Sequence, residues 1–244
     1  MPPWRRTYDE FRARHNSLDD KNTYVYRILI RAYQDDELVP SCDTNQLLSV
    51  PMVNDTASLP VLDPARDALR RHVLEHSLKT GDFTLKSGAK SSWFLDTKQT
   101  ACRPEGIVFV ADVALSIIPS NATAIGGLTM GADPVAFGIA AVGATRGRDL
   151  RSFSVRKEAK DHGVTGRLAG ALRPGDKVVI TEDTVTRGTS IMEAVDAVVA
   201  FGAEPVLITV IVDRGGTCAA MAAERGIPFV PMLTAPDLGF GYGT

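Results

Sequence analysis

Cysteine is scarce in this sequence, and the few cysteines present form no recognisable pattern. The 244 residues contain three of them, Cys42, Cys102 and Cys218. None belongs to a C-x-x-C pair or a Cys/His cluster, so neither a zinc site nor a disulfide framework is predicted. A reducing cytosol is the simplest compartment for such a chain.

Long apolar runs and a strong net charge are also missing. The most apolar stretch, residues 106–119, is too short to span a bilayer and contains Asp112. The first residues lack the apolar core of a signal peptide. The formal net charge is -2, so no overall basic field attracts nucleic acid or an anionic membrane. We therefore expect a soluble cytoplasmic protein with neither partner, in which local groups must supply any phosphate binding.

The first part of the chain differs in composition from the rest. Residues 1–61 are rich in charged and polar side chains, and residues 50–64 carry three prolines among polar residues, as a linker does. No chemical motif occurs in this part. We predict an N-terminal extension of unknown role at 1–61 and one domain at 62–244.

From residue 62 onward, apolar segments with the periods of strands and helices alternate. The helices are expected at 64–78, 105–118, 132–144, 191–201 and 218–225, and the strands at 122–126, 153–155, 177–181, 205–212 and 228–232. This alternation predicts an α/β fold with a central parallel sheet flanked by helices. The flanking segments are expected to form a smaller hood-like element. Right-handed crossovers place the carboxyl ends of the strands at one edge, where such folds bind ligands.

One strand of this sheet runs into acids and then into a loop of hydroxyls. After the apolar residues 178–180 come Glu182 and Asp183, and then a loop and helix start formed by Thr186, Arg187, Gly188, Thr189 and Ser190. Backbone N–H groups at a helix start, together with hydroxyls, can surround a phosphate, and carboxylates can accept hydrogen bonds from ribose. The simpler alternative is a helix capped by Thr and Ser. The Walker ending and the G-x-G-x-x-G fingerprint are both absent from this loop.

This segment resembles the phosphoribosyl pyrophosphate signature of the type I phosphoribosyltransferases. The resemblance implies that Glu182 and Asp183 hold the ribose hydroxyls and that residues 186–190 hold the 5′-phosphate. Arg187 stands where the family often has a small or hydroxyl residue.

A second segment concentrates positive charge. Arg156, Lys157, Lys160 and His162 fall within seven residues, next to Gly163. Such a run is often a solvated surface loop, but cationic donors also stabilise a departing pyrophosphate. The run resembles the Arg-Lys-x-x-Lys-x-His-Gly catalytic loop of orotate phosphoribosyltransferases. That resemblance implies a loop shared across a homodimer, with Lys160 the strongest catalytic candidate beside Arg156, His162 and Asp183.

Two further segments resemble the parts of that family that bind the base. Lys86 lies in a Phe-x-Leu-x-Ser-Gly pattern that is otherwise a possible hairpin turn, and the aromatic pair Trp93–Phe94 follows it. Neighbouring residues of a strand point oppositely, so at most one of the two aromatic rings faces a base, and we select Phe94. Arg214 follows a buried strand and could hold the carboxylate of orotate. A structural pairing with Asp213 is the alternative.

The turn at residues 126–134 matches the family's glycine-rich pyrophosphate turn, although Thr129 and Met130 replace a frequent Tyr-Lys pair. Taken together, these resemblances imply an enzyme that converts orotate and phosphoribosyl pyrophosphate into orotidine 5′-monophosphate and pyrophosphate. Mg²⁺ would be carried mainly by the substrate, without a dedicated protein metal site. The alternatives are a phosphoribosyltransferase for another base and a non-catalytic sensor that binds nucleic acid. The intact Lys160 loop and the net charge of -2 disfavour the sensor.

Overall fold

The computed structural model describes residues 59–84, 90–160 and 166–243. All of these residues belong to one compact unit, Asp55–Thr244. The extension predicted at 1–61 lies almost entirely outside the described residues, so the boundary at 61/62 stays a prediction. Among the described residues, no helix is long and apolar enough to cross a membrane.

The main sheet has six strands in the order β5-β4-β3-β6-β7-β8. Their bounds are β3 Ala124–Leu128, β4 Arg151–Lys160, β5 Gly166–Gly170, β6 Lys177–Val185, β7 Glu204–Asp213 and β8 Leu233–Thr234. β3 to β4, β3 to β6, β6 to β7 and β7 to β8 are parallel. The predicted α/β fold with a mostly parallel sheet is confirmed.

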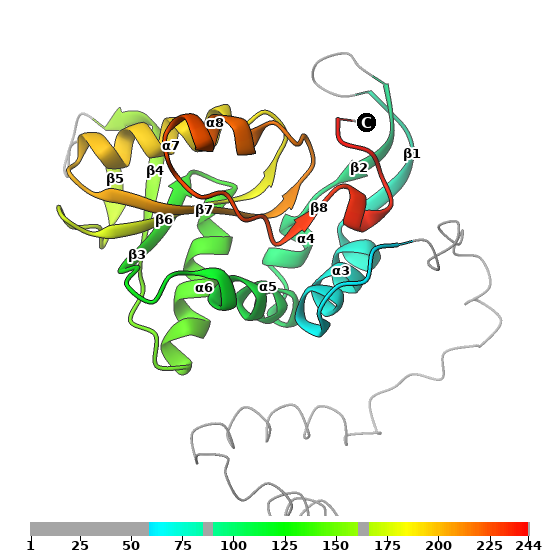
Figure 1. Cartoon of the computed structure of the whole chain (residues 1–244), viewed down its shortest axis with the longest axis horizontal. Coiled ribbons are helices and arrows are strands. Elements are labelled where there is room, and N and C mark those ends of the chain that lie inside the picture. Colours follow the sequence, from blue (N-terminus) through cyan, green and yellow to red (C-terminus); the bar gives the residue numbers. More distant parts are fainter. Residues whose placement is uncertain (1–58, 85–89, 161–165, 244) are drawn as a thin grey trace, which may run out of the picture. The chain divides into compact units, whose positions relative to one another are not determined.

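The helices lie in two layers, one on each face of this sheet (Figure 1). The lower layer in that view contains α3 Pro64–His76, α4 Lys98–Ala101, α5 Pro104–Ile117 and α6 Ala132–Thr145, whereas α7 Thr189–Ala200 and α8 Cys218–Glu224 cover the upper face. Alternate residues of β6 feed the two cores: Val179 packs with α3, α5 and α6, while Val178 and Ile180 pack with α7 and α8. This alternation follows from the period of a strand.

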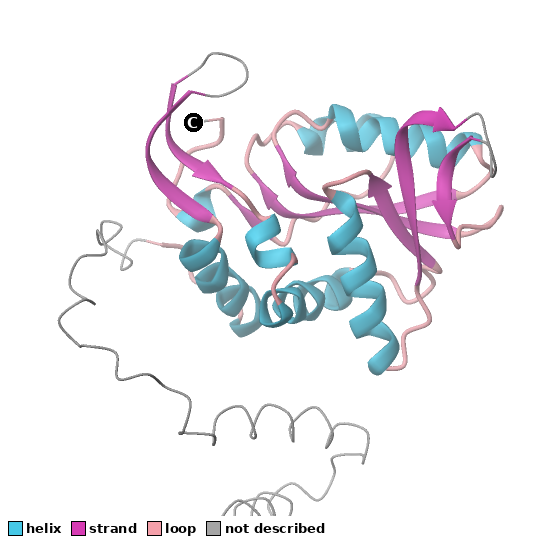
Figure 2. Ribbon diagram, turned by 180° about the vertical axis from the view of Figure 1, so that it is seen from behind, coloured by secondary structure: helices cyan, strands magenta, loops and turns pink. Residues whose placement is uncertain are grey.

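Two strands stand apart from the main sheet and form the expected small additional element. β1 Leu78–Thr84 and β2 Lys90–Leu95 pair antiparallel as a two-stranded sheet. Figures 1 and 2 show this sheet, which we call the hood, rising beside the carboxyl end of the chain. Trp93 of β2 is fully buried and stacks on Phe240 at a centroid distance of 4.4 Å, so the C-terminal segment anchors the hood.

Three sequence predictions about the strands were wrong in detail. The charged run from Arg156 to Lys160 continues β4 rather than beginning a loop, and β5 returns antiparallel to it, so the sheet has an antiparallel edge strand. The acidic pair lies within β6, which reaches Val185. The strand expected at 228–232 makes only an isolated bridge at Phe229, and the paired segment is Leu233–Thr234.

The order of the strands locates a place for ligands. The chain runs from β3 outward to β4 on one side, and later returns through β6 on the other side of β3. Connections that leave in opposite directions open a crevice at the carboxyl ends of the two strands, and open α/β sheets bind ligands there. In this chain, the crevice lies where Leu128 ends β3 and the acidic pair approaches the end of β6.

Candidate active site

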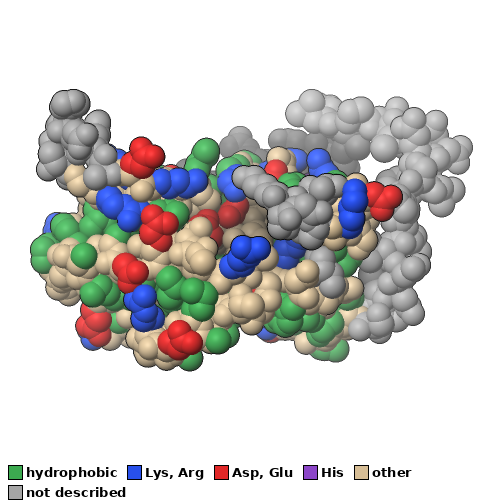
Figure 3. All heavy atoms as spheres, turned by 90° about the horizontal axis from the view of Figure 1, so that it is seen from above, with side chains coloured by type: hydrophobic (Ala, Val, Ile, Leu, Met, Phe, Trp, Pro, Cys, Tyr) green, Lys and Arg blue, Asp and Glu red, His purple; other side chains and the backbone are tan. Residues whose placement is uncertain are grey.

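A cleft of about 980 Å³ opens at this edge of the sheet, between the end of β6 and the hood. Val185 and Ile191 belong to its apolar lining, and the other lining residues are Lys79, Phe83, Phe94, Glu182, Thr184, Thr186, Arg187, Gly188, Thr189, Ser190, Arg214 and Gly243. The lining therefore brings the phosphate-type loop, one aromatic residue of β2 and Arg214 to one cavity. Figure 3 shows acidic and basic side chains interspersed over this side of the molecule.

The loop after β6 has a backbone suited to an anion. Gly188 precedes α7 with φ at +88°, a left-handed conformation that favours glycine. The exposed residues Thr186, Thr189 and Ser190 surround the start of the helix. From the other side, the Thr217 hydroxyl donates to the carbonyl oxygens of Thr186 at 3.0 Å and of Arg187 at 3.3 Å. These hydrogen bonds from Thr217 hold the backbone of the loop. The hydroxyl groups of the loop and the N-terminus of α7 line the cleft, where both can contact an anion.

The acidic pair is buried at the crevice. Glu182 and Asp183 are 9% and 7% exposed. Burial, and then the charge of Asp183, raise the pKa of Glu182 to about 8. The free protein therefore holds a carboxyl group that gives up its proton reluctantly. Hydroxyl donors or a cation placed against this pair would favour the ionised form.

Lys98 partly compensates this acidic pair. Its Nζ forms an ion pair with Oδ2 of Asp183 from the first residue of α4. Burial lowers the pKa of Lys98, but the hydrogen bond and charge of Asp183 outweigh it and leave this pKa raised. The neighbouring Thr97 hydroxyl lies 2.7 Å from that of Thr184, so α4 is joined to β6 at two adjacent positions. Sequence reasoning missed Lys98, because 85 residues separate it from Asp183.

The glycine-rich turn after β3 lies directly against the acidic pair. A Cβ atom added to Gly131 would lie 1.8 Å from Oε1 of Glu182 and 2.7 Å from Oδ1 of Asp183. Only a residue without a side chain fits at this position. The turn predicted to receive pyrophosphate and the acids predicted to hold ribose are therefore neighbours at the switch point of the sheet. Met130 in the same turn is 72% exposed.

Arg214 is buried between β2 and the end of β7. Its guanidinium carbon lies 4.3 Å from the centre of the Trp93 ring, and its Nη2 donates to the Ser91 hydroxyl at 3.1 Å and the Trp93 carbonyl oxygen at 3.4 Å. Burial lowers the pKa of Arg214. Oδ1 of Asp213 accepts from the backbone N–H groups of Gly215 and Gly216.

The two aromatic residues of β2 point in opposite directions, as their spacing predicts. Trp93 is fully buried, while Phe94 is 40% exposed and lines the cleft beside Phe83 at a centroid distance of 5.7 Å. Lys79, from the start of β1, lines the same side and was not among the residues predicted from sequence. Lys86 lies outside the described residues.

The basic segment lies on the hairpin formed by β4 and β5. Arg156 is partly buried and its Nη1 lies 3.4 Å from the carbonyl oxygen of Gly166, while Lys157 is exposed. The backbone of Lys160 ends β4, and His162 lies outside the described residues. Arg156 and Lys157 are not among the residues that line the cleft. The roles predicted for this segment therefore stay predictions.

Comparison with known proteins identifies the family. No model of a known protein family matches the chain. The chain is 36% identical over 170 residues to the orotate phosphoribosyltransferase of Rhodopirellula baltica, covering 67% of this chain and 88% of that protein. It is 38% identical over 180 residues to the orotate phosphoribosyltransferase of Streptomyces avermitilis, and the match covers 73% of this chain and 99% of that protein. The chain belongs to the orotate phosphoribosyltransferase family.

Solved structures agree with this assignment. A phosphoribosyltransferase from Corynebacterium diphtheriae superposes with a TM-score of 0.63 at 31% identity, covering 72% of this chain and 99% of that one. The Mycobacterium tuberculosis orotate phosphoribosyltransferase in complex with phosphoribosyl pyrophosphate superposes with a TM-score of 0.61 at 28% identity, covering 72% and 100%. The resemblance on which the fold and activity were predicted is therefore confirmed.

Proposed function

We propose that this chain transfers the ribose 5-phosphate of phosphoribosyl pyrophosphate to a ring nitrogen of orotate. The products are orotidine 5′-monophosphate and pyrophosphate, as in pyrimidine nucleotide synthesis. The observation that carries the proposal is a single cleft lined by a buried acid, a hydroxyl-rich helix start and Arg214. The family relatives, which are named for this activity, support it.

The phosphoribosyl group would lie across the end of β6. Glu182 and Asp183 would accept hydrogen bonds from the two ribose hydroxyls. The 5′-phosphate would lie against Thr186, Thr189 and Ser190 and the backbone of Arg187 and Gly188. A helix N-terminus favours an anion there because its unpaired N–H groups point outward.

Orotate would occupy the hood side of the cleft. Arg214 presents a guanidinium group that can hold a carboxylate with two parallel hydrogen bonds. Phe94 offers an exposed ring for the face of the base, and Lys86 would approach from the neighbouring turn. Because uracil lacks this carboxylate, we expect it to bind more weakly than orotate.

The chemistry requires little covalent help from the protein. The bond between C1 of the ribose and the pyrophosphate oxygen breaks, and that carbon gains positive charge as pyrophosphate leaves with the electron pair. A nitrogen of orotate forms the new bond to C1 and gives up its proton, which the departing pyrophosphate or water can accept. Arg156, Lys157, Lys160 and His162 would neutralise the charge that develops on pyrophosphate. Holding the two reactants in one orientation contributes most of the remaining acceleration.

Mg²⁺ would accompany phosphoribosyl pyrophosphate, neutralising charge on its oxygens. The donor set fits such a substrate-carried ion, since carboxylate oxygens are ligands that Mg²⁺ accepts. Glu182 and Asp183 supply these oxygens, but Oδ2 of Asp183 already bonds Lys98. We therefore propose that oxygens of phosphoribosyl pyrophosphate supply most of the coordination of this ion.

We also propose a cytoplasmic homodimer, in which the segment from Arg156 to His162 reaches the partner's cleft. The resemblance of this segment to the family's shared catalytic loop supports the proposal. Arg156 and Lys157 belong to the β4–β5 hairpin and are not among the described residues that line the cleft of their own chain, which agrees with the proposal.

A base panel tests the function. The full chain would be mixed with phosphoribosyl pyrophosphate, Mg²⁺ and one of orotate, uracil, adenine or hypoxanthine, and pyrophosphate release would be measured. We expect release with orotate alone. Release with another base in place of orotate would keep the sugar-phosphate site and remove the assignment of Arg214. If pyrophosphate is released with none of the four bases, the non-catalytic sensor is favoured.

A further inference from the structure

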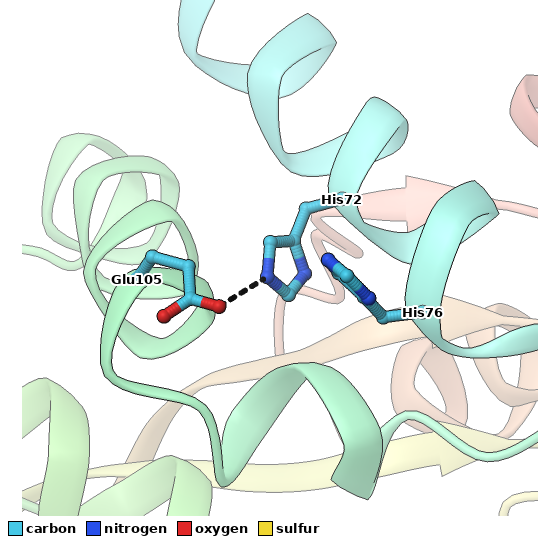
Figure 4. Close-up of side chains that lie close together, drawn as sticks. All are labelled: His72, His76 and Glu105. Carbon is cyan, nitrogen blue, oxygen red and sulfur yellow. Dashed lines mark ion pairs between the residues drawn. The ribbon is translucent and has the colours of Figure 1, made fainter. Parts of the chain in front are cut away.

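Three side chains with metal-binding atoms converge at the junction of α3 and α5, outside the cleft. His72 and His76 are four residues apart on α3 and therefore share one face of the helix. Glu105 belongs to the first turn of α5. One ligand atom from each lies within 4.8 Å of the other two. Figure 4 shows the His72 ring with the Glu105 carboxylate on one side and the His76 ring on the other, and the dashed line joins His72 to Glu105.

His72 is held in one orientation. Its Nδ1 lies 3.1 Å from the Thr100 hydroxyl, which lies 2.7 Å from the Ser77 hydroxyl. This chain of hydrogen bonds occupies Nδ1 and directs Nε2 toward Glu105. A ligand histidine typically shows this arrangement, with the second ring nitrogen bonded to a neighbouring group that fixes the ring and its tautomer.

The Nε2 atom of His72 has no hydrogen-bond partner among the described residues, and His72 is only 6% exposed. The nearest charged group is Oε1 of Glu105 at 3.7 Å, which exceeds a hydrogen-bond length. Buried polar atoms are nearly always paired, because an unpaired one costs free energy. A cation between His72 and Glu105 would remove that cost.

The imidazole ring of His72 lies close to the start of α5. A Cβ atom on Gly106 would lie 2.7 Å from Cε1 of His72 and 2.2 Å from the carbonyl oxygen of Thr100. The glycine therefore allows the ring to lie against the start of α5.

We propose that His72, His76 and Glu105 bind one divalent transition-metal ion, with Zn²⁺ the best match and water at the fourth position. Two imidazole nitrogens and one carboxylate oxygen form a ligand set typical of Zn²⁺. Tetrahedral bonds of roughly 2.0 Å put ligand atoms about 3.3 Å apart. The spread of up to 4.8 Å closes to that value through rotation of the exposed Glu105 and partly exposed His76 side chains.

The ion would have a structural effect. It would join α3 to α5, and through Thr100 to α4, the helix whose first residue, Lys98, pairs with Asp183. None of the three ligand residues lines the cleft. We therefore expect metal binding to raise the unfolding temperature without supplying a reacting group.

The test uses the full chain after treatment with a chelator. Zn²⁺ affinity and stoichiometry would be measured by competition with a chromophoric chelator, and Co²⁺ would report the ligand geometry through its visible absorption. We expect one ion per chain and a higher unfolding temperature with Zn²⁺. Failure of the unmodified protein to bind an equivalent of either ion overturns the proposal.

Variants locate the ion. His76→Gln and Glu105→Gln change side chains that are not fully buried, and each should weaken Zn²⁺ binding by about tenfold or more and abolish the thermal shift. His15→Gln, Glu224→Gln and the cleft variant Glu182→Gln should bind as the unmodified chain does. If His76→Gln does not fold, Glu105→Gln decides alone. Unchanged affinity in Glu105→Gln, or lost binding in Glu182→Gln, places the ion elsewhere and contradicts the proposal. These readouts do not depend on turnover.

Discussion

The guanidinium group of Arg214 lies 4.3 Å from the centre of the Trp93 ring and donates to Ser91 from the same strand. A ring face attracts a cation, so Trp93 and Ser91 hold the group at one end of the cleft. The strand that buries Trp93 also turns Phe94 into the cavity. The position of the proposed carboxylate contact and that of the proposed base contact are therefore set by one strand.

Arg214→Ala should raise the KM for orotate far more than the KM for phosphoribosyl pyrophosphate. Losing a charge-assisted pair costs about 1.5–3 kcal/mol, or roughly ten- to hundred-fold in affinity. Steady-state kinetics with each substrate varied in turn measures this. Arg225→Ala, at the exposed residue that follows α8, is the matched control. An unchanged orotate KM in a folded Arg214→Ala protein would return Arg214 to a purely structural role.

Lys98→Gln tests whether the cation of α4 positions the acidic pair. Without it, both carboxylates stay buried with less compensation, so the pKa of Glu182 should rise further. The KM for phosphoribosyl pyrophosphate should then increase, and the acid limb of the pH profile should move to higher pH. Lys98→Arg should restore much of the activity. Since the Lys98 side chain is 43% exposed, we expect a loss of stability of only about 1 kcal/mol. An unmoved acid limb would show that Lys98 does not act through the pair.

The pKa of Glu182, raised by burial and by Asp183 to about 8, predicts how stability varies with pH. A carboxyl group whose folded-state pKa exceeds the unfolded one favours folding only while protonated. Its contribution is complete below the unfolded value of about 4.5 and is lost as the pH rises to about 8. The full loss is on the order of a few kcal/mol.

Denaturant unfolding of the ligand-free protein, between about pH 5 and about pH 8, measures this dependence. Glu182→Gln should flatten the curve, stabilise the protein at the alkaline end and weaken phosphoribosyl pyrophosphate binding. Glu224→Gln, the same chemical change at an exposed position, should leave the slope unaltered. Equal slopes in the unmodified and Glu182→Gln proteins would contradict the assignment.

Lys160→Ala should reduce kcat by about a hundred- to a thousand-fold, as loss of a preorganised charge contact does. The fold should persist, because the residue ends an edge hairpin. Mixing Lys160→Ala with Asp183→Asn chains tests the shared loop: in a homodimer, one of the two clefts in each hybrid would recover an intact set of residues. Recovered turnover supports sharing across subunits, and its absence, with dimer exchange verified, argues against it.

The general architecture was predictable from the sequence, because buried parallel strands and amphipathic helices have distinct periods. The ends of the strands were not. Three of the residues 182–185 are acidic or polar, so the sequence indicates a turn there. They continue β6 because β7 offers them hydrogen-bonding partners, as the pairing of Glu182 with Val210 shows. Likewise, β4 extends past Val155 because β5 pairs with it on both sides of an irregularity, at Val155 with Leu168 and at Lys160 with Gly166. This edge of the sheet tolerates charged residues.

The candidate site was predictable only where its residues form local motifs. The loop at 186–190 and Arg214 each follow a strand, and strand ends meet at one edge of the sheet. The contact of Lys98 with Asp183 and that of His72 with Glu105 join segments far apart in the sequence. No spacing of residues in the sequence indicates either contact. The i,i+4 pair of His72 and His76 was the one local signal for the second site.

Orotate absorbance tests the central claim most directly. With the full chain, phosphoribosyl pyrophosphate and Mg²⁺, we predict loss of orotate in equal amount to the pyrophosphate released and the orotidine 5′-monophosphate formed. Asp183→Asn should lose most of this activity while its circular dichroism stays unchanged. Orotate that persists in the presence of correctly folded protein, substrate and Mg²⁺ would contradict the account.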